Sequence, residues 1–128
     1  MYREIQEIQP VMETVQSHLR EALLAGNTRD MIERSDQAQA AAAVAKEQMD
    51  RLLGSGQAAV PSTFIEPKTE VRFLDASNRA LSMALEEAEK VALGTDVDGM
   101  RARVIGFKTR TDFADAYLRA TLGTEGTS

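Results

Sequence analysis

Apolar and small residues recur along this chain at alternating steps of three and four, in four separate blocks. Because an α-helix completes a turn every 3.6 residues, such steps place each set on one stripe of a helix. The pattern predicts an all-α fold, either an up-down four-helix bundle or two paired antiparallel helical hairpins with coiled-coil-like seams. The four predicted stripes are Ile5, Ile8, Met12, Val15 and Leu19; Met31, Ser35, Ala38, Ala42, Ala45, Met49 and Leu52; Val71, Leu74, Asn78, Leu81, Leu85, Ala88 and Ala92; and Val97, Met100, Val104, Phe107, Thr111, Ala114 and Leu118.

Glycines and capping residues mark the boundaries between the predicted helices, which together form one helical domain over residues 1–123. Gly26 suits a left-handed helix end, and Gly94 repeats the arrangement as a helix stop. Side chains that can accept the first backbone N–H groups of the following helix come next, namely Asn27 or Thr28 and Thr95 or Asp96. The predicted helices span about residues 3–25, 28–53, 68–93 and 96–122, with a connection at 54–66 and a flexible tail at 124–128.

Three segments have a second interpretation. Pro10 lacks a backbone donor, so the first helix either kinks there or begins near Gln9. Gly99 and Gly106 weaken the fourth helix, for which a strand over 101–107 is the alternative. A β-hairpin that pairs 63–66 with 69–73 competes with the start of the third helix. In the last two cases the unbroken stripe favours a helix.

The second block is rich in alanine between residues 38 and 45. Small side chains allow another helix to approach closely, and alanine has the highest intrinsic helix propensity. We therefore expect a tight seam here, with a loosely packed helix as the alternative.

Composition narrows the function classes. Aromatic residues make up 5% of the 128 residues and tryptophan is absent, so the core must be aliphatic, which suits close helix packing. The absence of cysteine excludes disulfides, thiolate metal sites and cysteine nucleophiles. A net charge of −5, without a dominant basic stretch, argues against nucleic-acid binding. Neither a signal peptide nor an apolar stretch of about 20 residues is found, so we expect a cytoplasmic protein or part of a macromolecular assembly, with no membrane span.

His18 is the single histidine, and it lies beside the stripe residue Leu19 at the edge of the predicted core. The segment 17–21 resembles histidine phosphotransfer segments, in which an exposed histidine on a helical bundle accepts a phosphoryl group. Those segments typically carry a basic residue and a glycine after the histidine, which Glu21 and Ala22 do not supply. A boundary histidine without a special role is the favoured interpretation, and His18 as a phosphoacceptor is the alternative.

No motif predicts catalysis, a cofactor or a metal site. A di-metal site in a bundle needs Glu-x-x-His pairs, which this chain lacks. The segment 96–99 begins like a calcium loop but lacks the later acidic residue, and Phe107 separates Gly106 from Lys108 in what would be a phosphate loop. We therefore expect a protein that is not an enzyme.

Charged residues cluster near the junction of the third and fourth predicted helices. In an antiparallel hairpin, acidic side chains at the end of one helix can neutralise basic side chains at the start of the next. This predicts an internal charge match, with nucleic-acid binding as the alternative. The basic residues are Arg101, Arg103, Lys108 and Arg110, and the acidic ones are Glu86, Glu87 and Glu89.

Five apolar side chains exceed what a minimal bundle core needs. Val60, Phe64 and Ile65 lie in the connection, where they either cover the end of the bundle or dock on a partner. Phe113 and Tyr117 are four residues apart beside the fourth stripe, and they widen it either for internal packing or for an intersubunit contact. These five residues form the predicted partner-binding set.

The sequence thus favours a non-catalytic protein–protein interaction protein, a small structural subunit or adaptor of a larger bacterial or phage assembly that binds a protein partner or itself. The segment 19–25 before a tight turn, with Asn78 in a later helix, resembles flagellar-type export chaperones, which implies an acidic bundle that holds a partner's segment. An acidic decoy that covers a basic partner site is a further alternative, and its contact face would comprise Glu86, Glu87, Glu89, Asp96 and Asp98.

Overall fold

The computed structural model describes residues 2–54 and 69–126, and every regular element in these ranges is helical. The elements are α1 (Tyr2–Leu24), α2 (Thr28–Gly54), α3 (Thr69–Glu89), the short 3₁₀ helix η1 (Val91–Leu93) and α4 (Val97–Gly126). The prediction of an all-α fold is confirmed.

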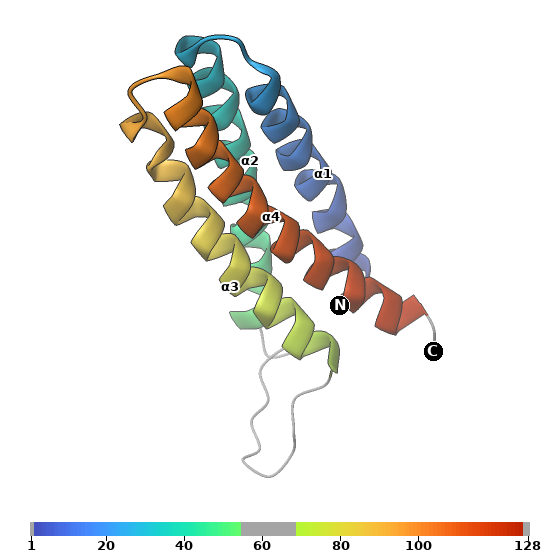
Figure 1. The fold of residues 1–128 in the computed structure, drawn as a ribbon. Coiled ribbons are helices and arrows are strands. Elements are labelled where there is room, and N and C mark those ends of the chain that lie inside the picture. The colour runs from blue at the N-terminus through green and yellow to red at the C-terminus, as the bar shows by residue number, and fades with distance from the viewer. Residues whose placement is uncertain (1, 55–68, 127–128) are drawn as a thin grey trace.

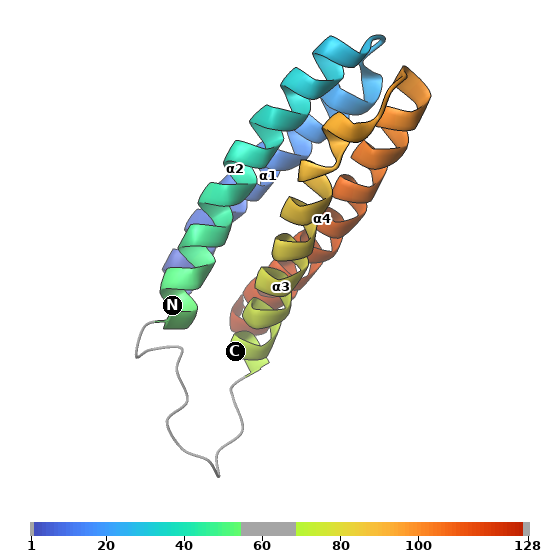
Figure 2. The ribbon, with the colours of Figure 1, turned by 90° about the vertical axis from the view of Figure 1, so that its left-hand side faces the viewer.

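The helices form two antiparallel hairpins, α1–α2 and α3–α4, whose turns lie at the same end of the molecule (Figure 1). The most extensive contacts occur within each hairpin, and the hairpins meet along α1–α4 and α2–α3. After a rotation of the view, α2 and α3 stand on the near side with α1 and α4 behind them (Figure 2). Since α1 and α3 do not approach each other closely along their backbones, they occupy diagonal corners of a helical bundle.

Three of the four predicted stripes lie in the core. Every residue of the first is buried, and the second and fourth are buried except for Leu52 and Val97 at their ends, which are half-buried. The third stripe is wrong at its end: Ala92 is exposed and Val91 is buried instead. The same offset of one residue already occurs within α3, where Ser77 and Ala84 have no exposed surface while the predicted Asn78 and Leu85 are half-buried. The buried face therefore follows Leu74, Ser77, Leu81, Ala84, Ala88 and Val91 at steps of three and four, and it continues in phase into η1.

Side-chain caps begin α2 and α4 as expected. The Asn27 side-chain oxygen accepts the backbone N–H of Asp30 at 2.8 Å, and Asp96 accepts that of Gly99 at 2.6 Å. These bonds satisfy N–H groups that have no partner within the helix. Asn27 and Asp96 are therefore the caps among the residues predicted.

The expected left-handed end at Gly26 is wrong, because none of the described glycines has a positive φ. Gly94, with φ −67° and ψ 135°, is extended rather than left-handed. A Cβ atom on Gly94 would lie 2.6 Å from the Cα atom of Met100. The turn before α4 therefore needs glycine for close backbone approach and not for conformational freedom.

The structure also decides between the alternative segment predictions. Helix α1 passes through Pro10, so a helix start near Gln9 is wrong. The carbonyl group of Gln6 loses its hydrogen-bond donor at Pro10, and because both residues are exposed, it faces solvent. The strand over 101–107 and the hairpin are wrong as well, since 101–107 lies in α4 and 69–73 in α3; residues 63–66 lie outside the described residues. Helix α4 continues to Gly126, beyond the predicted helix end near residue 122.

Within the described ranges, no helix has both the length and the apolar character needed to cross a membrane.

Candidate partner-binding groove

Small residues bring α3 and α4 close together. The buried hydroxyl of Ser77 on α3 donates a 2.6 Å hydrogen bond to the carbonyl oxygen of Ala114 on α4. Further along the same contact, a Cβ atom on Gly106 would lie 3.1 Å from a carboxylate oxygen of Glu87. A hydrogen bond from a serine to the backbone of a neighbouring helix requires a short separation, so only small side chains fit between the two helices at this point.

Large side chains that flank this contact therefore lie on its outer surface. Met83 is 52% exposed, Phe113 50% and Tyr117 38%. Together they line a hollow of about 480 Å³ on the outer side of the α3–α4 pair. We call this hollow the α3–α4 groove; its lining comprises Arg72, Asp75, Ala76, Arg79, Ala80, Met83, Arg110, Phe113 and Tyr117.

The groove combines an apolar floor with positive charge. Three arginines line it against one carboxylate, on a chain whose net charge is −5. The carboxylate of Asp75 already pairs with Arg79 at 2.8 Å. Arg110, by contrast, has no ion-pair or hydrogen-bond partner among the residues described here. The groove is therefore locally cationic although the protein as a whole is acidic.

The structure brings together two of the five predicted partner-binding residues. Phe113 and Tyr117 line the same groove, whereas Val60, Phe64 and Ile65 lie outside the described residues. The sequence analysis missed the contribution of α3, where Arg72, Ala76, Arg79 and Met83 follow one another at steps of four, three and four. This spacing places them on one helix face opposite the core stripe, and it was available in the sequence. The spacing could not show that these residues face Phe113 and Tyr117 of α4 across a groove.

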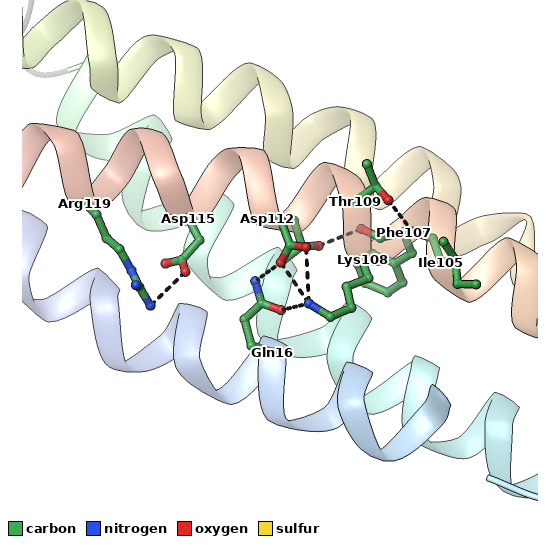
Figure 3. Close-up of polar contacts among 9 residues, drawn as sticks. Gln16, Ile105, Phe107, Lys108, Thr109, Asp112, Asp115 and Arg119 are labelled. Carbon is green, nitrogen blue, oxygen red and sulfur yellow. Dashed lines mark hydrogen bonds and ion pairs between the residues drawn. The ribbon is translucent and has the colours of Figure 1, made fainter. Parts of the chain in front are cut away.

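A second cluster is polar and joins α1 to α4 (Figure 3). Gln16, which is buried, donates to Asp112 at 2.8 Å and accepts from Lys108 at 3.3 Å. Lys108 also contacts both Asp112 oxygens at 3.0 and 3.2 Å. Because the polar groups of Gln16, Lys108 and Asp112 are hydrogen-bonded to one another, these side chains can lie in the interface between α1 and α4.

Asp115 lies next to this cluster and is only 8% exposed. Arg119 pairs with one of its carboxylate oxygens at 3.1 Å, while the other is buried without a hydrogen bond. Burial raises the pKa of the Asp115 carboxyl, the Arg119 guanidinium lowers it, and the carboxylates of Asp112 and Glu13 raise it further, so the net shift is upward.

The predicted charge match between the end of α3 and the start of α4 is wrong, because Arg101 does not pair with the glutamates of α3. Arg101 pairs with Asp98 at 3.3 Å and donates to the carbonyl oxygens of Leu23 and Ala25 at 3.2 and 3.0 Å. It therefore binds the C-terminal end of α1, where unsatisfied carbonyl groups attract a cation. Lys108 likewise turns to α1, so the basic residues of α4 divide between two faces, with only Arg110 in the groove.

The five acidic residues of the predicted decoy face lie at the same end of the α3–α4 hairpin. Several of them already have local partners: Glu87 lies 3.5 Å from Lys90, Asp98 contacts Arg101, and Asp96 caps α4. The decoy role stays a prediction.

His18 lies partly exposed on α1, and its Nδ1 atom is buried with no hydrogen-bond partner. No neighbouring group is therefore seen to orient the imidazole through Nδ1, and a phosphoacceptor role stays a prediction.

Within the described ranges, no group of three or more histidine, cysteine, aspartate or glutamate residues could hold a metal ion. Comparison with known proteins adds no relative: no family model, no curated protein and no solved structure matches this chain.

Proposed function

We propose that this protein is a non-catalytic, all-helical interaction protein, a small subunit or adaptor of a larger bacterial or phage assembly, which holds a segment of a partner protein in the α3–α4 groove. The observation that supports this most is the set of large apolar side chains, Met83, Phe113 and Tyr117, gathered around one hollow instead of packed in the core.

The composition of the groove favours a protein ligand. Aromatic residues, methionine and arginine are the residue types enriched at the centres of protein–protein interfaces, whereas lysine, glutamate, aspartate, serine and alanine are depleted there. Six of the nine residues that line the groove are of the enriched types, namely two aromatic residues, one methionine and three arginines, and the other three are one aspartate and two alanines. Leaving this apolar surface in water is unfavourable, so a partner that covers it gains the free energy of burial.

The alternative that the protein is an export-chaperone-like bundle, which holds a partner's segment, would use the same groove. An adaptor and a chaperone differ in how long the partner stays bound, and both need a concave apolar surface that the bundle itself leaves open. The phosphotransfer and decoy alternatives would instead use His18 and the acidic end of the α3–α4 hairpin.

Site-specific photo-crosslinking in cells of the encoding organism tests this proposal. Benzoylphenylalanine placed at Phe113 or Met83 should yield a discrete higher-mass product that contains one other protein. Ala40, exposed on α2 away from the groove, provides the matched control position. If all three positions give the same products, or none does, the groove is not the interaction surface.

A further inference from the structure

We infer that the occupant of the α3–α4 groove is an amphipathic helix of another protein that carries carboxylates beside its apolar stripe. This inference rests on the proposed function and specifies the chemistry of the partner.

The dimensions of the groove fit a short helical segment. On α3 the lining runs from Arg72 to Met83, a length of about 16 Å at 1.5 Å per residue, which corresponds to three turns of a helix. On α4 the apolar side chains Phe113 and Tyr117 are four residues apart. A groove with apolar side chains between two neighbouring helices is a surface on which an amphipathic helix can pack its i, i+3, i+4 and i+7 side chains.

The charges indicate which residues flank that apolar stripe. The contact between Ser77 and Ala114 sets the antiparallel register, so Arg72 and Tyr117 lie toward one end of the groove and Met83 and Arg110 toward the other. Because Arg110 lacks an ion-pair partner among the described residues, a carboxylate on the incoming helix would gain a charge-assisted hydrogen bond there. Positive charge at the Arg110 end of an apolar groove favours a helix with acidic residues beside its apolar stripe.

Two other occupants fit less well. A second copy of the chain that met this one groove to groove, in a symmetric contact, would bring arginines near arginines. A nucleic-acid strand would approach a protein of net charge −5, whose field opposes a polyanion.

A display selection tests the inference without knowledge of the natural partner. A library of helical peptides of about 18 residues, randomised on one face, is selected on the wild-type protein and counter-selected on the Phe113→Ala/Tyr117→Ala variant, whose circular dichroism must match the wild type. The enriched peptides should combine an apolar stripe with at least two flanking Asp or Glu residues.

Binding of one enriched peptide, synthesised with a fluorescent label, then tests the role of the arginines. Arg110→Glu should weaken binding by about tenfold, and raising the NaCl concentration from about 50 to about 500 mM should weaken binding to the wild type. Arg103→Glu is the matched control, because Arg103 is exposed on the same helix but does not line the groove. A version of the peptide with Lys in place of its Asp and Glu should prefer the Arg110→Glu variant.

The outcomes separate this inference from the function on which it rests. Enrichment of neutral or basic peptides, or equal binding to the wild type and Arg110→Glu, would overturn the inference and leave the proposed function standing. No enrichment beyond that on the counter-selected variant would overturn both. The inference also fails if an oligonucleotide displaces the peptide, or if light scattering detects a dimer that Phe113→Ala dissociates.

Discussion

The hydroxyl group of Ser77 on α3 donates a 2.6 Å hydrogen bond to the main-chain carbonyl oxygen of Ala114 on α4, in a fully buried position. This bond joins the two helices whose close contact leaves Phe113 and Tyr117 on the surface. It therefore links the packing of the bundle to the formation of the groove.

Replacing Ser77 tests this link. Ser77→Ala should lower the free energy of unfolding by about 1 kcal/mol through loss of the hydrogen bond, and Ser77→Leu by about 1–3 kcal/mol or more because the larger side chain overpacks the contact. Urea denaturation followed by far-UV circular dichroism measures both. Ser82→Ala on the same helix, which alters a partly exposed side chain, is the control and should change stability little. Equal effects at positions 77 and 82 would contradict the assigned role of the bond.

The alanine seam of α2 gives a second prediction. Ala42 has no exposed surface, so Ala42→Leu should overpack the core and destabilise the protein by about 1–3 kcal/mol. The neighbouring Ala43 is exposed, and Ala43→Leu should leave the melting temperature nearly unchanged. Thermal unfolding of the two variants compares the same chemical change at a buried and at an exposed position of one helix. Similar melting temperatures would mean that α2 is not tightly packed.

The turn between η1 and α4 gives a third prediction. An added methyl group at Gly94 would lie 2.6 and 2.8 Å from the Cα and N atoms of Met100, which are main-chain atoms and cannot simply rotate away. Gly94→Ala should therefore cost about 1–3 kcal/mol of stability. Nothing lies within 4 Å of the corresponding position at Gly26, where φ is not positive, so Gly26→Ala should be neutral or slightly stabilising. Chemical denaturation of both variants provides the comparison, and a neutral Gly94→Ala would disprove the close approach.

The pH dependence of stability reports on Asp115. Its pKa in the folded protein lies above the ordinary value of 3.8, chiefly because burial disfavours the charged form. Between the unfolded and folded pKa values the native state binds more protons, so this group lowers the stability of the protein as the pH rises through that window. Asp115→Asn removes the titration, so the variant should gain stability relative to wild type as the pH rises.

Urea denaturation of both proteins below, within and above this window measures the difference, and titration of the other carboxyl groups cancels in the comparison to first order. Asp36→Asn is the control, because Asp36 is exposed on α2 and is not one of the charged groups that shift the pKa of Asp115. A stability difference between wild type and Asp115→Asn that does not vary with pH would show that burial of Asp115 does not shift its titration.

Much of the bundle could be predicted from local pattern. The steps of three and four identified four helices, and the buried residues of α1, α2 and α4 match the predicted stripes almost throughout. The third stripe was offset by one residue, since the buried positions include Ser77, Ala84 and Val91 in place of Asn78, Leu85 and Ala92, because the packing of the neighbouring helix decides which of two adjacent residues faces the core. The prediction also failed at Gly26, because a short turn can be closed without a left-handed residue.

By itself the sequence determined the helices, the buried faces of α1, α2 and α4, and two candidate caps at each short turn, of which Asn27 and Asp96 are the caps in the structure, because periodicity and capping depend on residues close together in the chain. The tertiary structure alone decided that Arg101 binds the end of α1, that Gln16 meets Lys108 and Asp112, and that Arg72, Arg79 and Met83 share a groove with Phe113 and Tyr117. These relationships join residues from different helices. They depend on the distance and register at which the helices pack, and no single stripe of one helix contains that information.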